Sequence, residues 1–161
     1  MREALSPVQL VQNPALGSAL LWRFAKSFQE ETVSRLVNLE TLFLVLPLIF
    51  HRATLGQIST TQVGSGLGKM VSKLAEHRED LLAVHDRVLA LRHLTLQSVG
   101  TGMATKLLSL SYETGNVRAN EVKLPRQPER LKLAISGAEK LGRWFARVPA
   151  DQVFSLLQVH P

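Results

Sequence analysis

The chain has 161 residues, of which 45% are hydrophobic and 20% are charged, a balance typical of one globular domain rather than a disordered chain. It contains no cysteine, which excludes disulfide frameworks, thiolate zinc sites and a cysteine nucleophile. Nineteen Lys and Arg against thirteen Asp and Glu give a net charge of +6, which suits a nucleic acid or an acidic protein as partner. Residues 1–14 lack a basic region followed by an unbroken apolar core, so we expect no secretion signal and a cytoplasmic location.

The first predicted elements are an extended lead-in over residues 1–12 and a long helix. Asn13 is a good N-cap and Pro14 a good first helical residue. An apolar stripe at helical spacing then predicts that this helix continues to about Arg35.

The apolar run Leu39–Phe50, LETLFLVLPLIF, follows as the expected centre of the fold. Twelve residues are too few to span a bilayer as a helix, so the run predicts a helix buried on most sides and no membrane contact. Because Pro47 has no N–H to donate, we expect a kink or a helix end near Leu46.

Residues 51–62 are polar and β-branched, and we expect a connector there. The glycine-rich stretch 64–68 that follows superficially resembles a phosphate-binding loop. That loop requires Gly, four residues and then Gly-Lys-Ser/Thr, whereas this chain has Val63 and Met70 at the positions of the first Gly and the hydroxyl. We therefore predict no nucleotide and no other cofactor, and interpret the stretch as a flexible helix entry.

Three further helices are predicted, over residues 70–75, 78–92 and 95–108. Gly100 and Gly102 weaken the third helix. They either allow another helix to approach closely or mark a break.

A hairpin comes next, because residues 108–112 and 117–122 have strand character and flank a turn. Helices followed by a hairpin are typical of a winged-helix module, although a hairpin that caps a helical bundle gives the same pattern. The predicted fold class is therefore mainly α, a small helical domain with a winged-helix-like β-hairpin. We expect a single domain over residues 1–161, with the lead-in at 1–12, a helical part at 13–108, the hairpin at 108–124 and C-terminal helices at 125–161.

The C-terminal part predicts a long amphipathic helix over residues 129–148 and a short one over 150–157. Lys140, Arg143 and Arg147 are expected on one outer edge of the long helix, where charge reversal should spare the fold. Basic residues on the hairpin, its exit and this edge are the candidate interaction sites, and the alternative is that they form only a solvated face. They are Arg118, Lys123, Arg126, Arg130, Lys140, Arg143 and Arg147.

No catalytic or metal-binding pattern is present in the sequence. The five histidines have no second ligand at metal-binding spacing. Glu76, Glu79 and Asp80 are sufficiently explained as acids near the N-terminus of a helix. We therefore predict that the protein is not an enzyme.

Four segments together resemble the middle component of bacterial three-component ABC systems, and the resemblance covers nearly the whole chain. They are Gln12–Phe24, Phe43–His51, Arg87–Arg92 and Phe154–Pro161, the last with Gln158 and His160 where the family is expected to have Gly and Arg. The resemblance implies a non-catalytic bridging subunit that links an SMC/Rad50-like ABC ATPase to an effector, often a nuclease. Such complexes overlap with Lamassu-type defence against phage and plasmids, and DNA would be contacted through the complex.

The alternative function is a free-standing winged-helix DNA-binding regulator, and a weaker third option is a small enzyme with an unrecognised site. A reader of base edges needs several long polar side chains on its second helix, and residues 95–108 supply only Gln97 and Lys106. Salt-dependent binding of bare duplex would favour the regulator. Co-purification with a coiled-coil ATPase would favour the bridging subunit.

Overall fold

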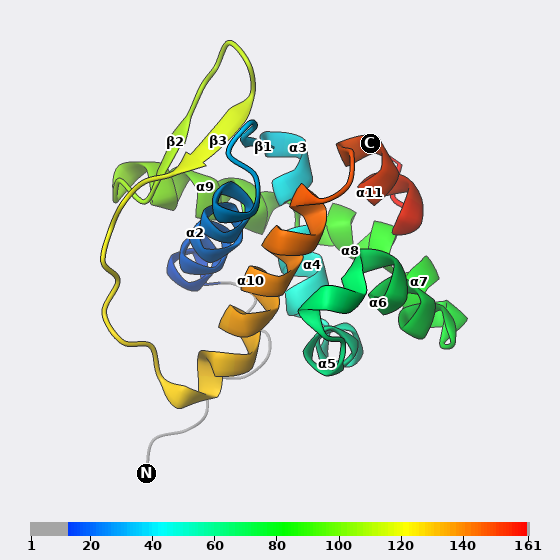
Figure 1. The fold of residues 1–161 in the computed structure, drawn as a ribbon. Helices are drawn as coiled ribbons and strands as arrows, with labels where there is room; N and C mark the ends of the chain where they lie inside the picture. Colours follow the sequence, from blue (N-terminus) through cyan, green and yellow to red (C-terminus); the bar gives the residue numbers. More distant parts are fainter. Residues whose placement is uncertain (1–12, 161) are drawn as a thin grey trace.

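The computed structural model describes residues 13–160, and within them one long N-terminal helix makes the most extensive contacts with other helices. This helix, α2 (Pro14–Glu31), packs against α9 (Arg92–Ala104) and α10 (Lys132–Ala146). Figure 1 shows α2 and α10 side by side, with a small sheet above them. The lead-in expected over residues 1–12 lies outside the described residues.

The start of α2 is as predicted, and its end is not. The side-chain oxygen of Asn13 accepts hydrogen bonds from the N–H groups of Ala15 and Leu16, at 3.0 and 3.2 Å. The helix ends at Glu31, four residues before the predicted end at Arg35. Arg35 instead turns its guanidinium to the carbonyl oxygens at the end of α10, which lie 2.8–3.3 Å away. This contact fixes the chain that leaves α2 against the C-terminal end of α10.

Two glycines allow the neighbours of α2 to approach its backbone closely. A Cβ at Gly142 of α10 would collide with the carbonyl oxygen of Phe24 and come within 2.9 Å of the Cβ of Ser27. A Cβ at Gly17 of α2 would lie 2.9 Å from the Cβ of Ser98 on α9. The contacts of α2 with α10 and with α9 therefore depend on the absence of a side chain at Gly142 and at Gly17.

The apolar run at 39–50 forms two short helices, α3 (Leu39–Leu42) and α4 (Val45–Ile49). Residues 44–49 are all buried, which confirms the prediction of an element enclosed on most sides. The break falls at 43–44 and not near Leu46, because Pro47 sits in the first turn of α4, where no N–H donor is needed.

One feature of this region bears on membranes. Among the described residues, no single helix is long and apolar enough to cross a membrane, although residues 39–49 and 52–60, bent by 98°, pass together on length and composition.

The connector expected at 51–62 is wrong, because residues 52–60 form a helix, α5, capped by the side chain of His51. The predicted helix at 78–92 is divided at Ala83, and the predicted 95–108 helix begins earlier, at Arg92. The elements of this region are α5 (Arg52–Thr60), η1 (Val63–Ser65), α6 (Gly66–Ala75), α7 (Arg78–Leu82) and α8 (Val84–Ala90).

The predicted hairpin is present as β2 (Leu108–Leu110) and β3 (Asn116–Ala119). A third strand, β1 (Val37–Asn38), was not predicted, since two residues give no periodicity to recognise. It pairs with β3, so the antiparallel sheet has the order β1-β3-β2. The fold class is thus mainly helical with a small sheet.

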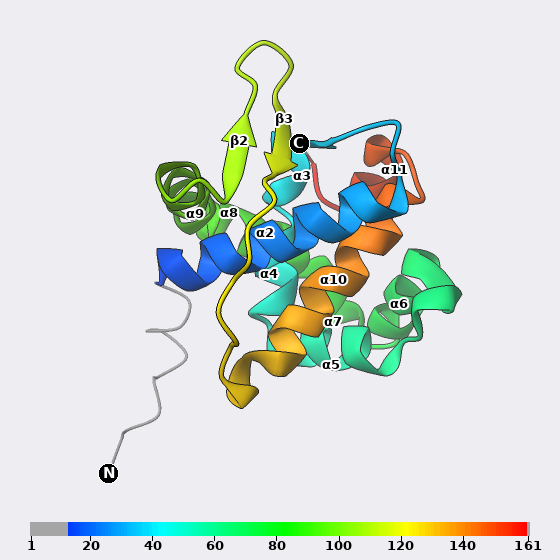
Figure 2. The same cartoon turned by 60° about the vertical axis from the view of Figure 1, so that its left-hand side comes forward.

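After β3 the chain crosses the outer face of α2 as an extended connection, drawn in yellow in Figure 2. The indole N–H of Trp22 donates to the carbonyl oxygen of Asn120 at 2.9 Å, and Lys26 pairs with Glu121. The remaining elements are η2 (Glu129–Leu131), α10 and α11 (Ala150–Leu156).

The two glycines of α9 have different surroundings. A Cβ at Gly102 would touch the side chain of Leu108, whereas a Cβ at Gly100 would meet nothing within 4 Å. Helix α9 runs through both without a break. Of the two alternatives left by the sequence, the close approach of a neighbouring element is therefore the one observed. It occurs at Gly102, and the neighbour is a residue of strand β2 rather than another helix.

Candidate interaction surfaces

Lys140 is engaged inside the fold. Its Nζ donates to the carbonyl oxygens of Ile58, Ser59 and Thr61 at 3.2, 3.0 and 3.0 Å, and the side chain is half-buried. These carbonyls lie at the C-terminal end of α5, where a positive charge is favourable. Lys140 therefore joins α10 to α5.

Arg147 is also tied to other elements. Its Nε lies 2.7 Å from a carboxylate oxygen of Glu31, and its Nη1 donates to the carbonyl oxygen of Val63 at 2.8 Å. The indole of Trp144 donates to the same carbonyl at 2.9 Å. The expectation of three bases on one free outer edge is thus wrong for two of them, because α5 and the end of α2 cover that side of α10. Arg143 alone is exposed without such a contact among the described residues.

The other four candidate bases follow one another along β3, the connection after it and η2. All four are exposed, and within residues 13–160 none forms an ion pair or a side-chain hydrogen bond. We call this set the basic strip, and it consists of Arg118, Lys123, Arg126 and Arg130. Its charges are available to phosphates or to carboxylates of another molecule.

A half-buried polar cluster joins α5 to α7 and α8. The Nδ1 of His51 accepts from the N–H of Thr54 at 3.3 Å and lies 2.7 Å from the Thr54 hydroxyl. Its Nε2 lies 3.9 Å from a carboxylate oxygen of Asp80, and Arg87 donates to the Thr54 hydroxyl at 3.4 Å. Burial, followed by the charge of Arg87, lowers the pKa of His51, and Asp80 opposes that shift. Burial also lowers the pKa of Arg87. A neutral His51 is therefore the form that caps α5.

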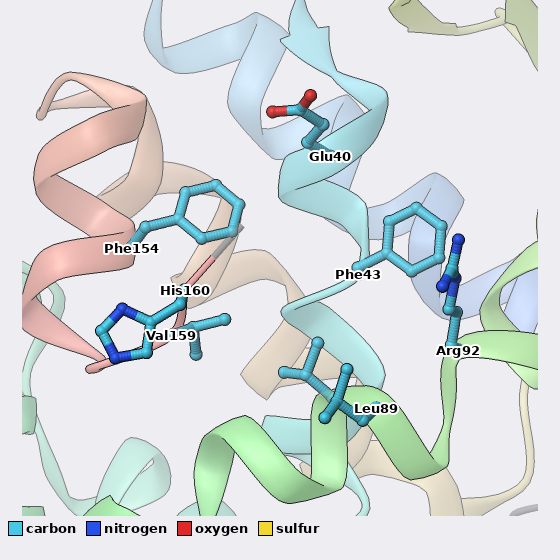
Figure 3. Close-up of a pocket in the computed structure, with 8 residues that line it drawn as sticks. Glu40, Phe43, Leu89, Arg92, Phe154, Val159 and His160 are labelled. Carbon is cyan, nitrogen blue, oxygen red and sulfur yellow. The ribbon is translucent and has the colours of Figure 1, made fainter.

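An apolar groove of about 290 Å³ lies between α3, α8 and α11 (Figure 3). Phe154 reaches from α11 toward α3, Leu89 rises from α8, and the ring of Phe43 lies beside the Arg92 side chain. We call it the apolar groove, and its lining residues are Glu40, Phe43, Val88, Leu89, Arg92, Phe154, Val159 and His160. Sequence reasoning missed it, because these residues come from three separate segments whose contact no local pattern reveals.

The C-terminal tail forms one wall of this groove. Gln158 adopts a left-handed conformation with φ 56°, and the N–H of Val159 bonds to the carbonyl of Phe154 at 3.0 Å. The N–H of His160 donates to Nδ1 of His85 at 3.2 Å. A second hollow of about 430 Å³ lies beyond the tail and shares Phe154, Val159 and His160 with the first. The tail thus separates two adjoining depressions on one face.

The remaining sequence candidates are placed on helices. Gly66 begins α6 with φ 85°, in agreement with the interpretation of the glycine-rich stretch as a helix entry. Glu79 and Asp80 lie in the first turn of α7, as helix-stabilising acids do. Within residues 13–160, no group of three or more His, Asp or Glu side chains is arranged to hold a metal ion.

Comparison with protein-family models shows which family the chain matches. Residues 1–161 match the family model described as the ABC-three component (ABC-3C) system Middle Component 3. No curated protein and no solved structure shows significant similarity to this chain.

Proposed function

The chain belongs to the ABC-three component system Middle Component 3 family, and from this premise we propose that it is a non-catalytic bridging subunit. It would link an SMC/Rad50-like ABC ATPase to an effector such as a nuclease, in cytoplasmic defence against phage or plasmids of the Lamassu type. The observation that carries the proposal is the family match over residues 1–161.

The surface of the protein supports a bridging role. A subunit that links two others needs two separate contact regions. The basic strip runs along the connection on one side of the molecule in Figure 1, and α8 and α11, which border the apolar groove, lie on the other side. One region is charged and the other is apolar, so they suit different partners.

Co-expression of the three components of the system tests the proposal. We expect the ATPase and the effector to co-purify when this chain is present, and to separate when it is omitted. We also expect the isolated chain to hydrolyse no ATP and to cleave no DNA. If the ATPase and effector associate equally well without this chain, it is not the bridge.

A second candidate function is a free-standing winged-helix DNA-binding regulator. The observation that favours it is the sheet order β1-β3-β2 with α9 placed directly before the hairpin, together with exposed His93, Gln97 and Lys106 on or just after that helix. Titration of the isolated chain with a duplex at two salt concentrations separates the functions. Tight, salt-dependent binding without the other components favours the regulator, and its absence favours the bridge.

A further inference from the structure

The apolar groove combines one exposed leucine with a buried apolar floor. Leu89 is 57% exposed, while Val88, Phe154 and Val159 beside it are at least 91% buried. Leu89 and the half-buried Phe43 beside this apolar floor can receive apolar side chains of another molecule.

The charges of the groove indicate which molecule it binds. Arg92 and Glu40 lie on either side of Phe43, and both are exposed without an ion pair among the described residues. A nucleic acid would be repelled by the Glu40 carboxylate and would gain little from an apolar floor. A small molecule is poorly enclosed, because the groove is shallow and at about 290 Å³ is as small as ligand pockets become. A protein segment that carries both charges fits the lining.

We propose that the apolar groove binds an amphipathic helix of another component of the three-component complex. Apolar side chains of that helix contact Phe43, Leu89 and Phe154, one acidic residue pairs with Arg92, and one basic residue pairs with Glu40. The two opposite charges fix the direction in which the helix lies, and the second hollow beyond the tail extends the contact surface. This inference rests on the proposed function and assigns one of the two contact regions that bridging needs.

Variants with matched controls test the groove. Leu89→Asp and Arg92→Glu alter it, whereas Leu82→Asp and Arg78→Glu make the same changes at exposed residues outside its lining. Each variant is checked for an unchanged melting temperature and is then titrated, within the full chain, against the purified ATPase and against the purified effector. We expect Leu89→Asp and Arg92→Glu to weaken binding to one of the two partners by about tenfold or more. The reason is that a few residues that become buried at the centre of an interface carry most of its binding energy. Binding to the other partner should not change, and the controls should bind like the parent.

The outcomes separate the two proposals. If the parent chain assembles with both partners and the groove variants do so equally well, the groove inference is overturned and the bridging function stands. If the parent binds neither partner, both are overturned. If light scattering shows that the parent forms a dimer which Leu89→Asp dissociates, the occupant is a second copy of this chain, and the heterotypic helix is rejected.

Discussion

Lys140 and Arg143 are three residues apart on α10, but only one of them contributes to the stability of the fold. Lys140 donates hydrogen bonds to three carbonyl oxygens at the end of α5, whereas Arg143 faces solvent. Lys140 therefore has a structural role, whereas the charge of Arg143 is free to contact another molecule.

We predict that Lys140→Glu destabilises the protein by about 3 kcal/mol, because it removes charged hydrogen bonds and directs a carboxylate at three carbonyl oxygens. Arg143→Glu should change the free energy of unfolding by less than about 0.5 kcal/mol. Urea denaturation of both variants measures the difference. Equal midpoints would mean that the contacts of Lys140 do not stabilise the fold.

Lys106 provides a second test at the scale of a residue. It follows the last turn of α9 with φ 64°, a conformation that costs a residue with a Cβ about 1 kcal/mol and costs glycine little. The N–H of Leu107 bonds back to the carbonyl of Gly102 at 2.8 Å, so the turn is held in this form.

We predict that Lys106→Gly raises the free energy of unfolding by about 1 kcal/mol and the melting temperature by about 2–4 °C. Lys106→Ala is the control, because it removes the same side chain and keeps the Cβ. A similar gain in both variants would assign the effect to the lysine side chain rather than to the backbone.

At the scale of elements, α5 depends on a titratable cap. His51 accepts a hydrogen bond at Nδ1 only while that nitrogen is unprotonated, and its pKa in the folded chain is lowered by burial and by Arg87. Below about pH 6.5 the unfolded chain takes up a proton that the folded chain resists. The contribution of His51 to stability is therefore fully present above that pH and is lost as the pH drops toward the lower pKa of the folded state.

We predict that His51→Asn reduces this loss of stability below pH 6.5, because asparagine is a good N-cap that does not titrate. Melting temperatures at pH 8 and pH 5.5 measure it, with His77→Asn at an exposed position as the control. If the His51 and His77 variants lose the same stability as the parent, the cap does not cause the pH dependence.

The sequence allowed the long elements to be predicted more reliably than the short ones. Asn13 and Pro14 predict the start of helix α2. The alternation of apolar and polar residues around a turn predicts the hairpin. Helix α5 was missed because its cap is a histidine and its residues are polar and β-branched, while Lys140, 80 residues after Thr60, supplies part of its support. The groove could not be predicted either, since Phe43, Leu89 and Phe154 meet only in the folded chain.

At the scale of the whole molecule, the buried run of α3 and α4 is the centre of one core. Leu46 is completely buried within the hydrophobic core. A charged group at this position would have neither an ion-pair partner nor water to solvate it.

We predict that Leu46→Asp costs more than about 4 kcal/mol and leaves the chain largely unfolded at 25 °C. Leu133→Asp, at a leucine that is 61% exposed, should leave it folded. Circular dichroism and urea denaturation compare the two. A native spectrum and an unchanged midpoint for the Leu46 variant would show that this run is not the core.

The position of α2 between α9 and α10 also constrains how the protein is made. Helix α2 completes its packing only when α10, residues 132–146, has been synthesised. Strand β1 likewise can pair only after β3 has been synthesised. During synthesis, the apolar face of α2 therefore stays uncovered until most of the chain has left the ribosome. Nascent chains of this protein should depend on chaperones for longer than chains that fold from the N-terminus onward, and a truncated product that lacks α10 should be degraded rather than compete for partners.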